Sequence, residues 1–394
     1  MARFLFAVPP FAGHVNPTLG LGAELLKKKH EVAWLSFDPA LEEKIPEGGK
    51  FLLLASKIAE DEKERIKNDI TDLSKRKVYG LDSLKFLYED VLIPLNEGIL
   101  DEMKEFIGIF CPDIIINDQQ IFAAAIAAIQ KNIPYVTSVT APAAIKINES
   151  LPMVYEWEGE QIRAFQKKHG IDIDKRLDCS SLLTLVYTSK EFFGNAELPD
   201  YYKFIGPVVT RKDQHTEFDW TRLEKMGDRP KILITIGTLF DHNLKQQFFG
   251  KIIEAFAGED ISVVMISDPD LFDSIPENFV IAKQIPQLEL MQQIDAVICH
   301  GGHNTVCEAL CNALPLVVLP IAYDQSYVAG CVADSGVGIR MNFNRFKASQ
   351  LRDSLYTVLS DPAYKDRANV IQQSFSNAGG VTKAVTYLEN LLRN

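Results

Sequence analysis

Short runs of almost wholly apolar residues recur along the chain, separated by stretches that are typical of helices. Runs without polar alternation indicate strands buried on both faces, which occur in parallel sheets covered by helices. Because strand and helix alternate in this way twice over, the pattern predicts two doubly wound α/β domains. The predicted strands lie at 3–8, 31–37, 113–117 and 135–139 in the first half, and at 231–237, 261–267, 279–282, 295–300 and 314–320 in the second.

A polar, charged stretch separates the two sets of runs. Residues 211–228, RKDQHTEFDWTRLEKMGD, have the composition of a linker with room for one helical turn. We therefore expect a first domain over 1–210 and a second over 229–375, with 376–394 forming a terminal helix that packs back towards the first domain. Residues 56–110 predict amphipathic helices inserted between strands. Because ligands gather at the carboxyl ends of parallel strands, we expect the site in a central cleft that the two domains face.

The composition is that of a globular protein, with 47% hydrophobic and 24% charged residues. A net charge of -12 and a pI near 5.2 argue against non-specific binding to nucleic acid or anionic lipid. An anionic ligand would need a local site of backbone N–H groups at a helix end. Six cysteines without the density of a disulfide scaffold indicate reduced thiols in a cytoplasmic protein. Pro9 and Pro10 interrupt the apolar start, which favours a strand over a signal peptide, and no uninterrupted apolar run reaches the length of a membrane helix.

Two candidate catalytic side chains follow predicted strands of the first half. His14 is expected on a turn between Pro10 and a helix that begins near Pro17. It is either a hydrogen-bonded loop histidine or a general base that works near neutral pH. Asp118 follows the strand at 113–117. It is either the cap of the next helix or a carboxylate that accepts the imidazole N–H of a neighbouring histidine and stabilises the imidazolium.

A third stretch of interest, CHGGHNTVCEALC at 299–311, also follows a predicted strand. The strand is expected to end at His300, two glycines follow, and Asn304 and Thr305 are expected to begin a helix. Glycines before a helix N-terminus let backbone N–H groups approach a phosphate, and the helix dipole adds attraction. The stretch therefore predicts a diphosphate site in an acidic chain.

The same stretch has an alternative interpretation as a zinc site. His300, His303, Cys307 and Cys311 are spaced by three, four and four residues, which is compatible with one helical face. However, His300 is expected to end a strand, so the four side chains would not converge, and paired C-x-x-C knuckles are absent. The two cysteines fit better as small core residues that pack the helix on its sheet. We therefore expect no metal.

Taken together, these motifs resemble a known family. GHVNP after the first strand, followed much later by QIPQ, HGGHNTVCEAL and DQ, resembles the GT-B nucleotide-sugar glycosyltransferases of family 1. Within that family the sequence is most similar to the bacterial macrolide and YjiC-like enzymes, which are related to plant UDP-glycosyltransferases. The resemblance covers nearly the whole chain, including the closing segment NAGGVTKAVTYLENLL at 377–392, and is most specific at 284–325. It implies two Rossmann-like domains, the first for the acceptor and the second for the nucleotide sugar.

The resemblance also implies roles for individual residues. His14 would be the base that deprotonates the acceptor hydroxyl, and Asp118 would orient it. The donor diphosphate would bind His300 and the helix start that follows. Asp324 and Gln325 would bind the transferred sugar, as a pair that in plant members accompanies glucose. The full set of implied donor-binding residues is Thr238, Gln284, Ile285, Gln287, His300, Gly302, His303, Asn304, Thr305, Glu308, Asp324 and Gln325.

Within this set, Glu308 would bind the ribose hydroxyl groups and Gln287 would lie near the ribose. Two positions depart from the family pattern. Gln284 stands where the family usually has a tryptophan that stacks on the uracil ring, so the choice between UDP and dTDP donors is open, and the backbone at Ile285 is a candidate for reading the base. His303 replaces another common tryptophan, which changes the surroundings of the phosphate or sugar.

The resemblance implies an inverting transfer to a hydroxyl group, with the nucleotide sugar as co-substrate and no metal or other cofactor. The acceptor pocket is expected in the first domain, where apolar and aromatic residues suit a small phenolic, flavonoid or macrolide acceptor. Each of these residues could equally belong to the core. The candidates are Phe11, Phe86, Met153, Tyr155 and Trp157.

Three alternatives to this function remain open. Two are other enzymes of the same fold, a lipid-linked sugar transferase and a nucleotide-sugar epimerase. The third is a non-catalytic protein that binds a nucleotide or metabolite. The expected partners are a nucleotide-sugar donor and a small-molecule acceptor, without nucleic acid or an integral membrane segment, and we expect a cytoplasmic monomer or weak dimer.

Overall fold

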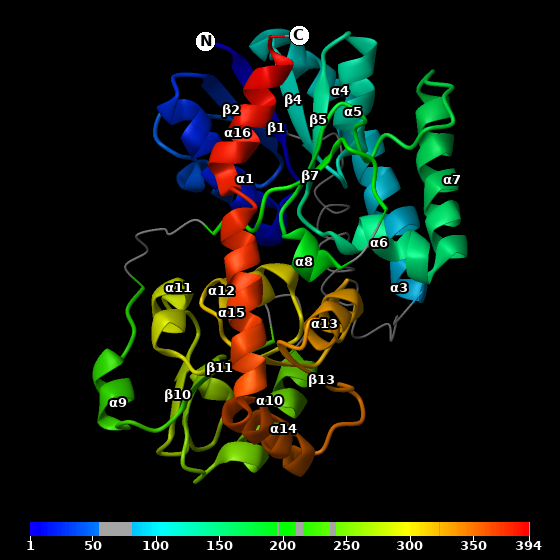
Figure 1. Ribbon diagram of the computed structural model, residues 1–394. Helices are drawn as coiled ribbons and strands as arrows, with labels where there is room; N and C mark the ends of the chain where they lie inside the picture. Colours follow the sequence, from blue (N-terminus) through cyan, green and yellow to red (C-terminus); the bar gives the residue numbers. More distant parts are fainter. Residues whose placement is uncertain (55–80, 195–196, 210–215, 237–241, 323, 394) are drawn as a thin grey trace. The chain divides into compact units, whose positions relative to one another are not determined.

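The computed structural model describes residues 1–54, 81–194, 197–209, 216–236, 242–322 and 324–393. These residues form two compact units (Figure 1). The N-terminal unit comprises the described parts of 1–54, 81–209 and 375–393, and the C-terminal unit comprises those of 216–374. Each unit is built around its own parallel sheet.

The sheet of the N-terminal unit has seven strands in the order β3-β2-β1-β4-β5-β6-β7, and every neighbouring pair is parallel. β1 and β4 are therefore neighbours, with Ala7 in register with Asn117. This adjacency brings the carboxyl ends of the two strands together. The strands are β1 (Arg3–Ala7), β2 (Glu31–Ser36), β3 (Lys50–Leu53), β4 (Ile114–Asp118), β5 (Tyr135–Val139), β6 (Thr184–Val186) and β7 (Tyr202–Phe204).

Helices cover both faces of this sheet, because its strands are apolar on both sides. Phe4 and Phe6 of β1 pack in the cluster that includes α1 and α16, whereas Leu5 and Ala7 pack in the cluster that includes α4 and α5. The last helix, α16, is joined to the neighbourhood of α1 by Glu389, which contacts Lys28 and His30. The helices and helical turns of this unit are α1 (Ala12–Lys27), η1 (Pro39–Lys44), α3 (Leu81–Phe86), the π-helix η3 (Leu87–Leu92), α4 (Ile93–Phe110), α5 (Phe122–Gln130), α6 (Ala143–Ser150), α7 (Pro152–Lys168), α8 (Lys190–Phe193) and α16 (Gly380–Leu391).

The C-terminal unit repeats the plan with a six-stranded parallel sheet in the order β10-β9-β8-β11-β12-β13. Its strands are β8 (Lys231–Thr235), β9 (Ser262–Ile266), β10 (Phe279–Ala282), β11 (Ala296–Cys299), β12 (Leu316–Val318) and β13 (Gly338–Arg340). Its helices and helical turns are α9 (Trp220–Lys225), α10 (His242–Phe256), η4 (Pro269–Leu271), α11 (Gln287–Leu290), η5 (Met291–Gln293), α12 (His303–Cys311), α13 (Gln325–Asp334), α14 (Ala348–Ser360) and α15 (Pro362–Asn377). The predicted pair of doubly wound α/β domains is confirmed. Among the described residues, no helix combines the length and the apolar character needed to cross a lipid bilayer.

Candidate active site

His14 lies in the first turn of α1, which corrects the prediction that it sits on a turn before a helix that starts near Pro17. The helix begins at Ala12, and the backbone N–H groups of His14 and Val15 both donate to the carbonyl of Phe11. Pro17 lies inside the helix, where its missing N–H removes a single intrahelical bond. The rigid first turn therefore fixes the direction in which the His14 side chain leaves the backbone.

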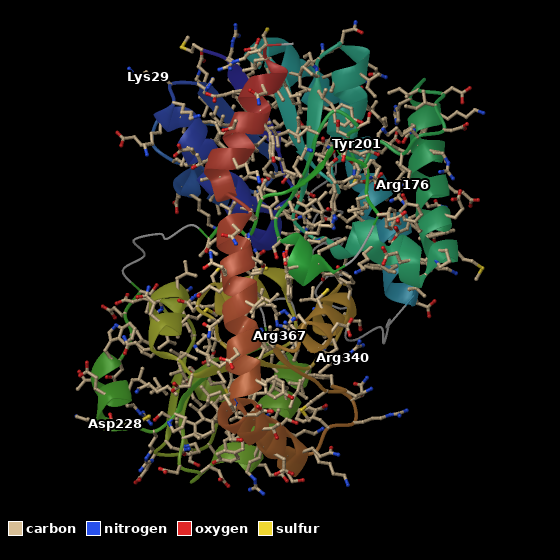
Figure 2. All side chains as sticks on the ribbon, viewed as in Figure 1. Lys29, Arg176, Tyr201, Asp228, Arg340 and Arg367 are labelled. Atoms are coloured by element: carbon tan, nitrogen blue, oxygen red, sulfur yellow. The ribbon has the colours of Figure 1, made fainter. Side chains whose placement is uncertain are left out.

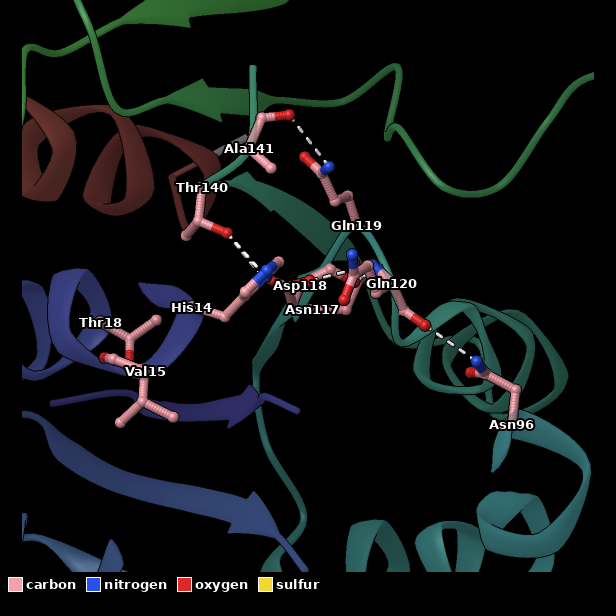
Figure 3. A network of polar contacts seen from close by, with 10 residues as sticks. All are labelled: His14, Val15, Thr18, Asn96, Asn117, Asp118, Gln119, Gln120, Thr140 and Ala141. Atoms are coloured by element: carbon pink, nitrogen blue, oxygen red, sulfur yellow. Dashed lines mark hydrogen bonds and ion pairs between the residues drawn. The ribbon is translucent and has the colours of Figure 1, made fainter. Parts of the chain in front are cut away.

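The side chains of His14 and Asp118 are in contact, as the sequence predicted. His14 Nδ1 lies 2.9 Å from Asp118 Oδ2, and the side chain of Asp118 is fully buried whereas that of His14 is 14% exposed (Figure 3). The contact follows from the neighbouring positions of β1 and β4, since Asp118 ends β4 and α1 follows β1. The alternative that Asp118 caps the next helix is wrong, because α5 begins only at Phe122 and its N-cap is Ile121.

Thr140 contacts both His14 and Asp118, and the sequence did not predict that it belongs to the site. Its Oγ1 lies 2.8 Å from His14 Nδ1 and 3.1 Å from Asp118 Oδ2 (Figure 3). Thr140 directly follows β5, which pairs with β4 in a register that places Ser138 opposite Asp118. Its position after a buried strand was the available signal, but only the strand order shows that this strand end adjoins that of Asp118.

The loops that carry Asp118 and Thr140 are themselves held by buried amides. The backbone N–H of Gln120 donates to Asp118 Oδ1, and Gln119 Nε2 donates to the carbonyl of Ala141. The fully buried Asn96 of α4 donates through Nδ2 to the carbonyl of Gln120, and its Oδ1 accepts the N–H of Ala123 (Figure 3). Oδ1 of Asp118 thus accepts a backbone N–H, which leaves Oδ2 for His14 and Thr140.

A second group of candidate residues follows β11 in the C-terminal unit. The imidazole of His300 lies directly against Gly302, the N-cap of α12: a Cβ added at Gly302 would come within 2.8 Å of His300 Nε2. Gly301 has a φ of +87°, and a Cβ there would lie 3.0 Å from Val318 Cγ1. The two glycines therefore let the ring pack against the start of the helix.

Burial sets the protonation of His300. It lowers the pKa of His300 to about 4, although a hydrogen bond with the backbone of Thr235 acts in the opposite direction. The ring is therefore neutral near pH 7 and can offer a hydrogen bond, but not a positive charge, to an incoming anion. The attraction for an anion then comes from the N-terminus of α12.

The first turn of α12 contains the other predicted phosphate-binding residues. Asn304 and Thr305 are half-buried, whereas His303 is 8% exposed and has its Nε2 3.5 Å from Cys307 Sγ. His303 therefore points into the unit, against its own helix. No three or more His, Cys, Asp or Glu side chains of the described part of the chain are grouped so that they could hold a metal ion, and the alternative zinc set is not brought together.

Glu308, predicted to bind the ribose, and Gln287, predicted to lie near it, are hydrogen-bonded to each other. Gln287 Nε2 donates to Glu308 Oε2 at 2.5 Å, which joins the start of α11 to α12. Burial raises the pKa of Glu308 to about 7, and the bond from Gln287 partly offsets this rise. Gln284 is exposed and Ile285 is half-buried, both between β10 and α11.

Gln325 is only partly available to a ligand. Its side chain is buried, and Oε1 accepts the backbone N–H groups of Ile321 and Ala322 at 2.9 and 3.0 Å. The predicted role as a sugar ligand is therefore restricted to donation by the amide NH2 group. Asp324 is the N-cap residue of α13 and makes no side-chain cap hydrogen bond. Thr238, also predicted to bind the donor, lies outside the described residues.

The five predicted acceptor contacts have different surroundings, and three of them, Met153, Tyr155 and Trp157, belong to α7. Phe11 precedes α1, and its ring centroid is 5.9 Å from that of His14. Tyr155 stacks on Arg176, which is labelled in Figure 2, and Trp157 packs on the core and contacts Tyr88 edge-on. The remaining candidates are Phe86, which is buried, and Met153, which is 85% exposed.

Comparisons with known proteins agree along the whole chain. Residues 251–391 match the family described as "Erythromycin biosynthesis protein CIII-like, C-terminal domain". The chain is 28% identical over 401 residues to the NDP-glycosyltransferase YjiC of Bacillus subtilis (strain 168), covering 98% of this chain and 96% of that protein. It is 26% identical to the uncharacterized UDP-glucosyltransferase YdhE of the same strain, covering 98% and 97%.

Solved structures show the same fold. The glycosyltransferase of kitacinnamycin matches with a TM-score of 0.76 at 21% identity, covering 99% of this chain and 98% of that one. The glycosyltransferase VinC in complex with dTDP matches with a TM-score of 0.73 at 19% identity, covering both chains completely.

Proposed function

We propose that the chain, as a family 1 glycosyltransferase of the macrolide and YjiC-like type that uses a nucleotide-sugar donor, moves glucose from a UDP-sugar to a hydroxyl group of a small, largely apolar acceptor. The observation that carries the proposal is the 2.9 Å contact between His14 Nδ1 and the buried Asp118 carboxylate. A protein that only binds a nucleotide has no need of a histidine held by a buried carboxylate, whereas a transferase that must deprotonate a hydroxyl group does.

In the proposed reaction, His14 Nε2 takes the proton of the acceptor hydroxyl as its oxygen attacks the anomeric carbon. The bond from that carbon to the diphosphate oxygen breaks at the same time, and the electron pair leaves with the nucleoside diphosphate. Asp118 stabilises the imidazolium that forms. Because the attack comes from the side opposite the leaving group, the configuration at the anomeric carbon is inverted.

The proposed site for the leaving diphosphate is the start of α12. Backbone N–H groups of its first turn, with the half-buried Asn304 and Thr305, would accept the developing charge together with His300. His300 would act as a neutral hydrogen-bond donor, since burial lowers its pKa to about 4.

Glucose is proposed as the transferred sugar on the basis of Asp324 and Gln325, which resemble the pair that accompanies glucose in plant members of the family. One of the similar proteins, YdhE, is itself named a UDP-glucosyltransferase. Asp324 would accept hydrogen bonds from sugar hydroxyl groups, and Gln325 would donate through its NH2 group, since its oxygen is held by the backbone. The sugar would then be recognised by one hydrogen-bond acceptor, Asp324, and one hydrogen-bond donor, Gln325.

The acceptor is proposed to be a natural product with a free hydroxyl group, because the structural neighbours include natural-product glycosyltransferases. Incubation of the chain with UDP- and dTDP-sugars and a set of phenolic and macrolide alcohols, followed by mass spectrometry, tests this directly. A product heavier by one hexose unit supports the proposal. No product from any pair, with UDP bound normally, would favour a binding protein.

The affinity for UDP should rise with pH between 6 and 8. In the ligand-free protein, burial raises the pKa of Glu308 to about 7, so the carboxyl is largely protonated at pH 6 and largely ionised at pH 8. An ionised carboxylate accepts two ribose hydroxyl groups better than a protonated one, so binding lowers the pKa and releases a proton. Calorimetric titration of UDP in buffers of different ionisation enthalpy measures both the affinity and the number of protons released on binding. Glu308→Gln should remove the pH dependence, and an affinity that falls with rising pH would contradict the assignment.

Gln284→Trp should tighten UDP binding by about 0.5–1.5 kcal/mol, the scale of an aromatic pair. Gln284 is exposed where the family pattern has a stacking ring, so the wild type should distinguish UDP-glucose from dTDP-glucose by less than about tenfold. Titration of UDP and dTDP into both proteins measures this. Gln293→Trp, at another exposed glutamine of the same unit, is the control for a ring at the surface. Unchanged affinities in Gln284→Trp would show that this position does not face the base.

We also propose that transfer needs no metal, because the N-terminus of α12, together with a hydrogen bond from the neutral His300, stabilises the diphosphate where a cation would otherwise bind. Dialysis against EDTA, followed by assay without added metal, should therefore leave the activity intact. Loss of activity that magnesium or manganese restores would show instead that a divalent ion accompanies the donor.

A further inference from the structure

Three side chains from three different elements meet at one point of the N-terminal unit. The hydroxyl of Thr140, just after β5, lies 2.8 Å from His14 Nδ1 of α1 and 3.1 Å from Asp118 Oδ2 of β4. The third side of this triangle, from Nδ1 to Oδ2, is 2.9 Å. Thr140 is 4% exposed, and the next residue, Ala141, is held by the hydrogen bond from Gln119 Nε2 to its carbonyl (Figure 3).

The donors and acceptors in this triangle can be ordered in one consistent way. An ionised carboxylate has no proton to give, so the short contact between His14 Nδ1 and Asp118 Oδ2 requires the proton to be on Nδ1. Towards Nδ1–H, the oxygen of Thr140 can then only accept. Its own hydrogen is left to donate to Asp118 Oδ2, which closes the ring of hydrogen bonds.

This order decides the tautomer of the imidazole. With the proton on Nδ1, the lone pair is on Nε2, which is the nitrogen that must act as a base. If Thr140 instead donated to Nδ1, the proton of the neutral ring would be on Nε2, and Nδ1 would face the carboxylate oxygen with two lone pairs opposed. The hydroxyl therefore reinforces the productive tautomer through both of its hydrogen bonds.

We propose that Thr140 is a positioning residue of this enzyme, whose hydroxyl holds the His14 ring in the Nδ1–H tautomer by bridging it to Asp118. The inference rests on the proposed function of His14 as the base. Thr140 does not itself accept the proton of the acceptor hydroxyl. The backbone N–H of Gln120 also contacts Asp118, and the Asp118 carboxylate acts with burial to raise the pKa of the buried Tyr187 phenol.

The first arm of the test reads the tautomer without any substrate. Two-bond ¹H–¹⁵N correlation spectra of ¹⁵N-histidine-labelled protein separate the two neutral tautomers, and His14→Gln identifies the His14 signals among the seven histidines. The wild type and Thr140→Ser should show His14 with the proton on Nδ1, whereas Thr140→Val, in which only the contact with Asp118 still favours that tautomer, should show a mixture of the two tautomers. A wild type with the proton on Nε2 would overturn the proposal, as would a Thr140→Val spectrum identical to that of the wild type.

The second arm reads catalysis. Thr140→Val should lower kcat by about tenfold, on the scale of one hydrogen bond to a charged group, with KM for the donor changed less than about twofold. Thr140→Ser should restore kcat to within about threefold, because it keeps the hydroxyl. The control is Thr184→Val, which removes an equally buried hydroxyl of the same sheet that donates to the carbonyl of Ser180. It should leave kcat and the His14 signals unchanged.

The two arms separate the possible failures. If the wild type transfers no sugar to any acceptor, the proposed function fails, yet the spectra still report whether Thr140 sets the tautomer. If the wild type is active and Thr140→Val retains kcat, Thr140 is merely structural and the inference fails alone. Should valine not be accommodated in the fold, Thr140→Ala removes the same hydroxyl group and is read by the same two measurements.

Discussion

Replacing His14 with alanine should lower kcat by roughly 10²–10⁴-fold, the usual contribution of a positioned general base. The affinity for UDP should stay close to that of the wild type, because the proposed donor ligands, such as His300 and Glu308, belong to the C-terminal unit. Steady-state kinetics with an aliphatic alcohol as acceptor measures the first effect, and calorimetric titration of UDP measures the second.

The choice of acceptor matters for this experiment. A phenol ionises more readily without help, so it should lose less activity in His14→Ala than an aliphatic alcohol does. His169→Ala is a matched control, since His169 of the same unit pairs with Glu97 away from the His14 contact and should keep full activity. Near-normal turnover of an aliphatic alcohol by His14→Ala would remove His14 from the mechanism.

The apolar runs predicted β1, β2, β4 and β5 of the first sheet and, in the second sheet, every described strand except β13. Each of the nine runs coincides with one strand, from β1 at 3–7 to β12 at 316–318, and only β4 extends beyond its run, by the single residue Asp118. The four strands missed are β3, β6, β7 and β13, which have only three or four residues. β3, β7 and β13 lie at sheet edges and are partly exposed, so they lack the apolar run that burial on both faces requires.

The candidate site was predictable where its geometry depends on local sequence, and less so where it depends on strand order. His14 and Asp118 each follow an apolar run, and the resemblance paired them. Thr140 carries no comparable mark, because a threonine after a strand is common, and its role depends on β5 lying beside β4. For Gln325 the sequence suggests more than the structure allows. Its amide was predicted to bind the sugar, but its side-chain oxygen accepts two backbone N–H groups of the loop before α13.

Asp118→Asn should lower kcat by roughly 10²–10⁴-fold while leaving UDP affinity unchanged, because an amide cannot do what both carboxylate oxygens do here. Oδ1 accepts the backbone N–H of Gln120, and Oδ2 faces both His14 Nδ1 and the hydroxyl of Thr140. An asparagine has one acceptor oxygen and one NH2 group, so it can satisfy one side only.

Either orientation of that amide is harmful. With its oxygen towards Gln120, the NH2 group faces His14 Nδ1 and favours the unproductive Nε2–H tautomer. With its oxygen towards His14, the NH2 group opposes the N–H of Gln120, and the neutral amide still does not stabilise an imidazolium. We therefore expect a small loss of thermal stability together with the large loss of turnover. Asp113→Asn, at an exposed carboxylate that accepts the N–H of Arg3 at the other end of β4, is the matched control and should keep its activity. If Asp118→Asn melts at a lower temperature yet retains the wild-type specific activity, Asp118 holds its loop and takes no part in the reaction.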